Sequence, residues 1–153
     1  MATNVKQQAR RLFDEAWNAG RLETIDEIVD PSYRGQDPLL GTIDRDGLKK
    51  SLQGYREAFP NLKFEVKEII CEGDTAVVRW SATGTNRGPL FGAPPTGKNA
   101  TVGGLTLGEY RNGRLVRDNT QWDALGLFRQ LGIEKMAPVG LGATPGVQPG
   151  KQH

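Results

Sequence analysis

The chain has almost no histidine. One residue of the 153, His153, carries an imidazole, and it lies in a Gly/Pro-rich stretch for which the sequence predicts no regular structure. A Ser-His-Asp triad, a Cys-His pair and a histidine-ligated metal site each need an imidazole held in a folded part of the chain. The sequence therefore excludes these sites and predicts neither a metal site nor a cofactor. Any chemistry has to use carboxylate, hydroxyl, amide or phenol groups.

Cysteine, charge of one sign and long apolar runs are also scarce. The single cysteine, Cys71, excludes an internal disulfide framework, and its place in EIICEG indicates a packed strand residue rather than a reactive thiol. Lys+Arg 20 against Asp+Glu 18 leaves a net charge of +2, scattered along the chain, so no nucleic-acid partner is indicated. No signal peptide and no segment long enough to cross a bilayer is recognisable. We therefore expect a cytoplasmic protein without a membrane partner.

Apolar residues recur at helical spacing in three segments before residue 60. The segments 3–19, 22–29 and 44–59 each carry one apolar stripe. Gly20 stands where a helix C-cap belongs, and Pro60 has to end the third helix. Between the second and third segments, SYRGQDPLLG predicts a short extended piece and a turn.

The sequence then changes to strand-like segments. LKFEVKEIIC, TAVVRWSATGT, ATVGGLTLGEY and RLVRDNTQW are rich in β-branched and aromatic residues and predict four consecutive antiparallel strands. Asn112-Gly113 predicts a tight hairpin between the last two, and DALGLFRQLG predicts a short closing helix. The fold class is therefore α+β: a curved sheet of four main strands and a short edge piece packed on three helices. We expect a single domain over 1–134 and a flexible tail over 135–153.

The last strand has polar residues on both faces. Strict alternation places Asp118, Thr120 and Trp122 with Val116 on one face, and Leu115, Arg117, Asn119 and Gln121 on the other. The strand before it offers small residues, Gly104 and Gly108, beside Thr106. Space next to polar groups, covered by aromatic residues from the helices, indicates a mostly apolar ligand pocket with a few directing groups.

Asp118 is the candidate general base, because burial raises the pKa of a carboxyl group and lets it exchange protons near neutral pH. The alternative is a structural aspartate paired with Arg79 or Arg117. Thr120 is the second candidate catalytic residue. The candidate substrate-binding residues are Trp17, Tyr33, Tyr55, Phe59, Phe91, Thr106, Asn119 and Trp122.

The loop GTNRGPLFGAPPTGK, residues 84–98, is stiffened by proline and bent by glycine. Leu90 and Phe91 stand at its tip. The sequence favours a role in which they cover the rim of the pocket, since rigid loops often serve binding. A plug that closes the core from one end is the alternative.

Six stretches match a known family: LFDEAWNAGRLETIDEIVDPSY, FPNLKFEV, EGDTAVVRWSATGT, GPLFGAPPTGK, NGRLV and DALGLFRQLG, within residues 5–132. The combination of the G-x-P-P-T-G-K loop with the L-G-L-x-R-Q-L-G end is specific. On these residues the chain resembles the SnoaL-like polyketide cyclases, or predicted ester cyclases, of the nuclear transport factor 2-like superfamily. The resemblance implies a cone-shaped α+β fold, a deep apolar pocket, ring chemistry in natural-product biosynthesis, and a homodimer or homotetramer formed through the outer sheet face.

The same resemblance locates the family's catalytic positions. Its aldol cyclases use an aspartate in the last strand, assisted by a histidine in the strand before, and these positions hold Thr120 and Thr106 here. Asn86 stands where many members carry another histidine. Asp118 lies two residues before Thr120, so a displaced carboxylate is available for related chemistry.

These observations favour a cofactor-independent enzyme, a cyclase, isomerase or related tailoring enzyme. It would act on an apolar, polyketide-like or polycyclic molecule, with Asp118 transferring protons and Thr106, Thr120 and Asn119 orienting oxygens. Two alternatives stay open. One is a non-catalytic small-molecule binding protein of the same fold. The other is an oligomerisation domain whose core is filled.

Overall fold

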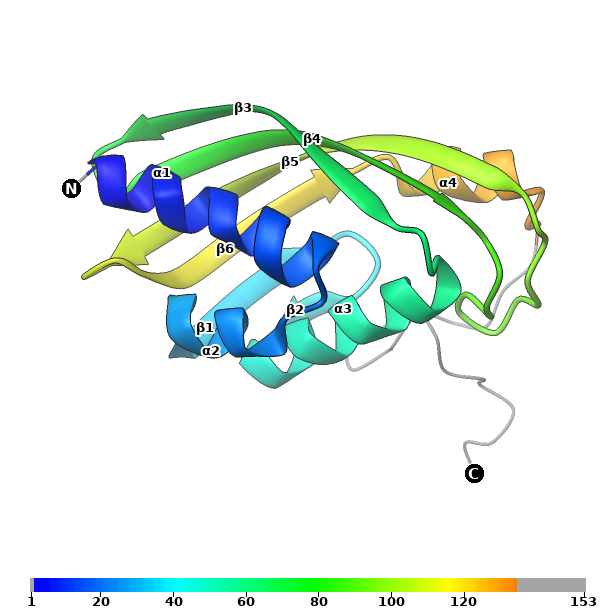
Figure 1. The fold of residues 1–153 in the computed structure, drawn as a ribbon, viewed down its shortest axis with the longest axis horizontal. Coiled ribbons are helices and arrows are strands. Elements are labelled where there is room, and N and C mark those ends of the chain that lie inside the picture. The colour runs from blue at the N-terminus through cyan, green and yellow to red at the C-terminus, as the bar shows by residue number, and fades with distance from the viewer. Residues whose placement is uncertain (1, 135–153) are drawn as a thin grey trace.

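The computed structural model describes residues 2–134. Its helices and strands follow one another in the α+β order expected (Figure 1). The elements are α1 (Ala2–Arg11), η1 (Leu12–Asn18), α2 (Leu22–Ile28), β1 (Val29–Asp37), β2 (Gly41–Ile43), α3 (Arg45–Ala58), β3 (Lys63–Glu72), β4 (Thr75–Thr85), β5 (Asn99–Arg111), β6 (Arg114–Trp122) and α4 (Ala124–Leu131). The segment predicted to be a tail, 135–153, lies outside the described residues.

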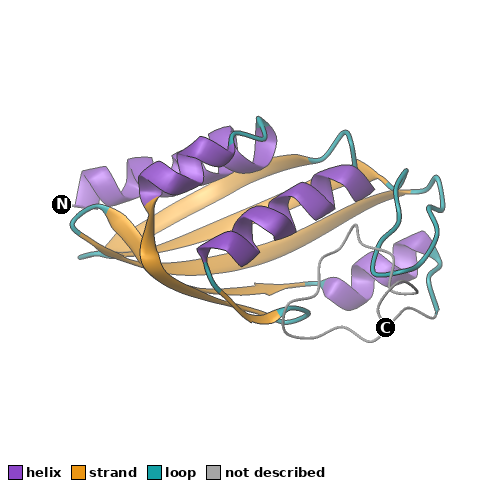
Figure 2. Ribbon diagram, turned by 90° about the horizontal axis from the view of Figure 1, so that it is seen from below, coloured by secondary structure: helices purple, strands orange, loops and turns teal. Residues whose placement is uncertain are grey.

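The strands form one curved six-stranded sheet in the order β2-β1-β6-β5-β4-β3. Helices α1, η1, α2 and α3 lie together over one face of this sheet, and α4 lies at its far end (Figure 2). Neighbouring strands are antiparallel except β1 and β6, which run parallel. The α+β cone expected from the sequence is therefore confirmed, with helices on the concave side of the sheet.

The sequence underestimates the first strand. The stretch expected to be a short edge piece contains β1, which is nine residues long, pairs with β6, and is followed by β2 at the sheet edge. Pro31 and Gly35 weaken its strand signal because both residues are rare inside strands. The parallel partner lies more than 80 residues later, as in the pair Gly35 and Asp118, so no local pattern reveals the pairing.

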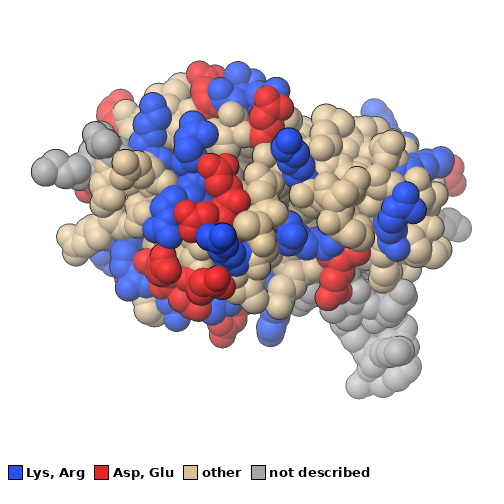
Figure 3. Space-filling model, viewed as in Figure 1, with Lys and Arg blue, Asp and Glu red and all other residues tan. Residues whose placement is uncertain are grey.

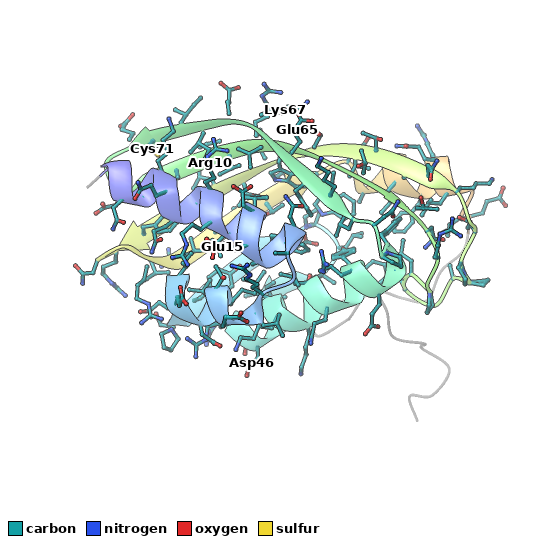
Figure 4. The ribbon with its side chains drawn as sticks, in the orientation of Figure 1. Arg10, Glu15, Asp46, Glu65, Lys67 and Cys71 are labelled. Atoms are coloured by element: carbon teal, nitrogen blue, oxygen red, sulfur yellow. The ribbon has the colours of Figure 1, made fainter. Side chains whose placement is uncertain are left out.

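The first helix is not α-helical throughout. After Arg11 it continues as a π-helix, η1, which ends at Asn18, and Gly20 follows with a φ of 73°. The Asn18 side chain fixes this end to the sheet, since its Oδ1 accepts from the Phe64 N–H at 2.7 Å and its Nδ2 donates to the Phe64 carbonyl at 3.0 Å. Glu15 projects from η1 (Figure 4) and accepts a hydrogen bond from Thr24 of α2. These contacts hold η1 against both α2 and β3.

Two clusters of buried side chains fill the cone. The first lies between α1, η1, α2 and the sheet and includes Phe13, Ile25 and Trp80, with half-buried Cys71 of β3 packed against it (Figure 4). The second lies at the other end, where Leu90 and Phe91 pack with Leu127 and Leu131 of α4. The thiol of Cys71 thus serves packing, as expected.

The loop 84–98 closes the core at one end. Leu90 is 0% and Phe91 4% exposed, so the expectation that they stand over a pocket rim is wrong and the plug is what the structure contains. Phe91 and Gly92 have φ values of 47° and 84°, and Leu90 and Ala93 exchange two backbone hydrogen bonds around them. This tight turn lets two large apolar side chains reach inward, where burial stabilises them.

Asn86 holds this loop from inside. Its Oδ1 accepts from the N–H and the hydroxyl of Thr96, at 2.8 and 3.1 Å, while its Nδ2 donates to the carbonyls of Gly88 and Ala58. The side chain is fully buried. The Asn86 side chain thereby gives hydrogen-bond partners to the Thr96 N–H and to the Gly88 and Ala58 carbonyls, which lie outside the sheet.

On the face seen in Figure 3, acidic and basic side chains are interspersed. Within residues 2–134, no helix is long and apolar enough to span a membrane.

We expect Asn86→Ala to lower the free energy of unfolding by about 3 kcal/mol, because it leaves several buried polar groups of the loop unpaired. Urea denaturation measures the change. Asn119→Ala, at an exposed position of β6, is the control and should change stability by less than about 0.5 kcal/mol. Equal stability of the two variants would contradict a structural role for Asn86.

Candidate active site

A cavity of about 160 Å³ lies between the concave face of the sheet and the helices. Most of its wall is apolar, and the aromatic rings of Phe13, Trp17, Phe64 and Trp80 form one continuous side, with ring centroids 5.0–6.4 Å apart. Polar atoms reach the cavity from few positions, and those that the following paragraphs use are Tyr33, Asp37, Tyr55, Thr106, Asp118 and Thr120.

Asp118 lies in the cavity wall and is hydrogen-bonded to a tyrosine. The Tyr33 hydroxyl donates to Asp118 Oδ1 at 2.8 Å, and Tyr33 is 1% exposed. The sheet register explains the pairing: Gly35 of β1 stands beside Asp118, so Tyr33, two residues earlier on the same face, reaches over a position that has no side chain. On the other side Asp118 pairs with Gly108 of β5. Glycines on both neighbouring strands leave room around the carboxylate.

A β-bulge sets which residues of β6 face inward. The register with β5 shifts between Glu109 and Tyr110, which pair with Arg117 and Leu115 and leave Val116 without a partner. Leu115 is consequently buried at 2% exposure and lines the cavity together with Asp118 and Thr120. Strict alternation grouped Leu115 with Arg117 on the face opposite Asp118, and this grouping is wrong because alternation does not continue through a bulge.

The pKa of Asp118 is raised to about 7, chiefly by burial; the hydrogen bond from Tyr33 opposes this rise and the charge of Asp37 adds to it. The arginines considered as structural partners are engaged elsewhere: Arg79 Nε donates to Glu68 at 2.8 Å, and Arg117 Nε lies 3.9 Å from Glu109. Asp118 is therefore a carboxyl group that can exchange a proton near neutral pH.

Two threonines lie in the cavity wall together with Asp118. Trp80 Nε1 donates to Thr106 Oγ1 at 3.0 Å, and Thr106 Oγ1 lies 3.0 Å from Thr120 Oγ1. The indole can only donate, and the two hydroxyls share one bond although they carry two hydrogens. One hydroxyl hydrogen of this pair thus remains for a third atom, such as a ligand oxygen.

A family model for SnoaL-like polyketide cyclases matches residues 7–131. The chain belongs to this family. Many solved structures are similar, and three of them illustrate the likeness. A proposed SnoaL-like polyketide cyclase from Jannaschia sp. CCS1 has a TM-score of 0.80 at 26% identity, covering 88% of this chain and 95% of its own. TsrD from Streptomyces laurentii has a TM-score of 0.78 at 26% identity. The match covers 87% of this chain and 98% of TsrD.

IdmH, a proposed polyketide cyclase from Streptomyces antibioticus, has a TM-score of 0.75 at 29% identity. The match covers 84% of this chain and 98% of IdmH. No curated protein matches. Membership in the SnoaL-like family, with its nuclear transport factor 2-like fold, confirms the resemblance read from the sequence. It supports a cyclase-type enzyme fold that binds a small molecule.

Most candidate ligand-binding residues of this SnoaL-like protein line the cavity, but two do not. Trp17, Tyr33, Tyr55, Phe59, Thr106 and Trp122 are part of its wall together with Asp118 and Thr120. Phe91 lies behind that wall, edge-on to Tyr55 with ring centroids 6.2 Å apart. Asn119 is exposed on the opposite face of β6, where it accepts a hydrogen bond from Gln121. The expectation that Asn119 orients a ligand oxygen is therefore wrong, because neighbouring residues of a strand face opposite ways.

Sequence reasoning missed Asp37 as a site residue. Its Oδ1 accepts from Trp122 Nε1 at 3.1 Å, and its Oδ2 accepts from the backbone N–H groups of Leu39 and Leu40. The available signal was an aspartate followed by Pro38 at the end of a strand, which is typical of a side chain that caps a turn. In the fold this turn lies against the cavity.

The described residues bring no three His, Cys, Asp or Glu side chains together as a metal site. Asp123 caps the start of α4, since its Oδ1 accepts a hydrogen bond from the Gly126 N–H at 2.9 Å.

Gly35→Ala should disrupt the Tyr33–Asp118 pair. A Cβ at this position would overlap the Tyr33 hydroxyl and lie 2.6 Å from Asp118 Oδ1, so we expect a loss of about 1–3 kcal/mol in the free energy of unfolding. Gly103→Ala is the matched control, since its Cβ meets only a backbone oxygen at 3.7 Å. Urea denaturation compares the two, and a Gly35→Ala protein as stable as the control would argue against the close packing described.

Proposed function

We propose that this protein is a cofactor-independent cyclase or isomerase in which Asp118 acts as general base and then as general acid on an apolar small molecule. The observation that carries this proposal is that Asp118 lines a mostly apolar cavity and that its carboxyl group accepts a hydrogen bond from Tyr33 at 2.8 Å. Burial raises the pKa of this carboxyl group to about 7. A carboxyl group titrating near the working pH is suited to both accepting and returning a proton.

In the proposed first step, the Asp118 carboxylate removes a proton from a carbon next to a carbonyl group. The electron pair of that C–H bond moves into the substrate, and negative charge develops on the carbonyl oxygen. A donor aimed at this oxygen stabilises the transition state more than the ground state. The unassigned hydroxyl hydrogen of the Thr106–Thr120 pair is the candidate donor.

Two outcomes follow from the same enolate. In an isomerase, protonated Asp118 returns the proton to a different carbon, so no atom is gained or lost. In a cyclase, the enolate carbon attacks a second carbonyl carbon of the same molecule, and the new alkoxide takes the proton back from Asp118, which restores the carboxylate. The names of the Jannaschia and Streptomyces antibioticus relatives favour ring closure in natural-product biosynthesis.

Tyr33 keeps Asp118 in position. Burial and the Asp118 charge raise the pKa of Tyr33 well above its usual value, so the phenol stays protonated and continues to donate. This hydrogen bond fixes Oδ1 and leaves Oδ2 for the substrate. Tyr33 is a positioning residue in this proposal.

A non-catalytic binding protein is the second candidate. Thr106 and Thr120 favour this candidate, because the aldol cyclases that the chain resembles carry histidine and aspartate at these two positions. An oligomerisation domain with a filled core is disfavoured by the cavity of about 160 Å³. Self-association through the outer sheet face is compatible with either candidate, because Ile70, Leu105 and Leu107 are 59%, 48% and 42% exposed there.

Proton abstraction can be tested without knowing the substrate, by following deuterium uptake into phenylacetone in D₂O by proton NMR. We expect the protein to accelerate exchange at the carbons beside the carbonyl, Asp118→Asn to lower the rate about a thousandfold, and Thr120→Val to lower it about a hundredfold. The rate should rise with pH up to about 7 and then level, since the carboxylate is the active form.

The control is Asp123→Asn, which keeps a helix-capping side chain outside the cavity and should exchange at the wild-type rate. An Asp118→Asn protein with the wild-type rate would remove Asp118 as the base. Binding of phenylacetone without accelerated exchange would favour the binding protein.

A further inference from the structure

The hydroxyl of Tyr55 is a buried donor without an acceptor. It lies on α3 and lines the cavity, and among residues 2–134 no hydrogen-bond partner for it is present. Buried polar groups in folded proteins are nearly always paired, so an isolated hydroxyl at a cavity wall calls for an explanation. A ligand oxygen is the explanation that the surroundings support.

The Tyr55 ring is held in place by its neighbours. Three aromatic rings surround the Tyr55 ring: Trp17 at 6.3 Å, Phe91 at 6.2 Å and Trp122 at 6.3 Å between centroids, the last two edge-on. Phe91 is itself held by the tight turn of the loop 84–98. The ring direction, and with it the position of the hydroxyl, is thus fixed by packing.

Asp37, the carboxylate whose charge acts on Tyr55, makes its hydrogen bonds to other groups. Asp37 accepts hydrogen bonds from Trp122 on Oδ1 and from two backbone N–H groups on Oδ2. Burial, and the charge of Asp37, raise the pKa of Tyr55 well above its usual value. Tyr55 therefore keeps its proton, and its hydroxyl stays a donor in the cavity wall.

The charge of the wall selects against anions. Asp37 and Asp118 both face the cavity, and its described lining contains no lysine, arginine or histidine. An anionic ligand would meet like charge without a compensating cation in a site of low polarity. The ligand group at Tyr55 is accordingly a neutral oxygen.

The cavity volume limits the buried part of the ligand. A cavity of about 150 Å³ in another protein takes up benzene, and the cavity here has about 160 Å³. The space fits one six-membered ring with a short substituent. A fused polycyclic ligand would require the wall to move.

We infer that Tyr55 is a recognition residue that donates a hydrogen bond to the carbonyl oxygen of a neutral, single-ring ligand. Tyr55 contacts Trp122, which lies four residues along β6 from Asp118. Tyr55 would therefore bind a part of the ligand away from the atoms that react at Asp118. The inference rests on the proposed function only in taking this cavity as the substrate site. It does not depend on catalysis by Asp118.

The test compares two probes of nearly equal size, acetophenone and ethylbenzene, of which only the first has a carbonyl oxygen. NMR titration of the indole N–H signals gives both affinity and location, because Trp122 lies at the Tyr55 end and Trp80 is bonded to Thr106. We expect acetophenone to bind about tenfold more tightly than ethylbenzene and to shift the Trp122 signal. In Tyr55→Phe this preference should disappear.

Tyr110→Phe makes the same chemical change at a cavity tyrosine that has no part in the proposed chemistry, and it should keep the preference. Equal affinities in the wild-type protein, or a preference that survives Tyr55→Phe, would overturn the inference. Loss of the preference in Tyr110→Phe but not in Tyr55→Phe would do the same. These are binding measurements, so unchanged deuterium exchange in Asp118→Asn would refute the proposed chemistry and leave the recognition role standing.

Two more probes test charge and size. Benzoate should bind more weakly than ethylbenzene, and 2-acetonaphthone, with a second fused ring, more weakly than acetophenone. Tight binding of benzoate would contradict selection for a neutral ligand, and tighter binding of 2-acetonaphthone would contradict the one-ring limit.

Discussion

The hydrogen bond between Tyr33 and Asp118 is the interaction on which the site depends. It holds a carboxyl group in an apolar cavity where ionisation is costly, and burial raises the pKa of Asp118 to about 7. The folded state therefore binds this proton more tightly than the unfolded chain, whose carboxyl has a pKa near 3.8. Stability contributed in this way is present at low pH and is lost as pH rises through about 7. At neutral pH, a carboxyl group that can exchange protons in this cavity therefore lowers the stability of the folded state.

The sheet is arranged so that this pair can form. Parallel pairing of β1 with β6 places Gly35 beside Asp118, and the bulge at Val116 turns Asp118 and Leu115 to the same side. The loop 84–98, held by Asn86, closes the far end and supports the Tyr55 ring through Phe91. Three unusual features of the fold therefore position the site: a parallel strand pair, a bulge and a stiff loop.

Local sequence signals predicted much of this structure. Helical spacing located the helices, alternation and hairpin residues located β3 to β6, and Asp118 and Thr120 were placed in the cavity wall. The inward position of Leu115 and the plug formed by Leu90 and Phe91 were not anticipated. They depend on a bulge and on long-range packing, which leave no periodic trace in the sequence. The outward position of Asn119 follows from strand alternation once Asp118 faces the cavity, and its assignment to the ligand ignored that pattern. Asp37 escaped notice because its role comes from Trp122, 85 residues away.

The central claim is that Asp118 is a buried carboxyl group that ionises near neutral pH. Carbon-13 NMR of the aspartate carboxyl groups, with the Asp118 signal assigned by its absence in Asp118→Asn, measures this directly. The account predicts one aspartate signal with a midpoint near pH 7. A midpoint near pH 4 for that signal would show that the carboxyl is solvated in the folded protein and would contradict the account.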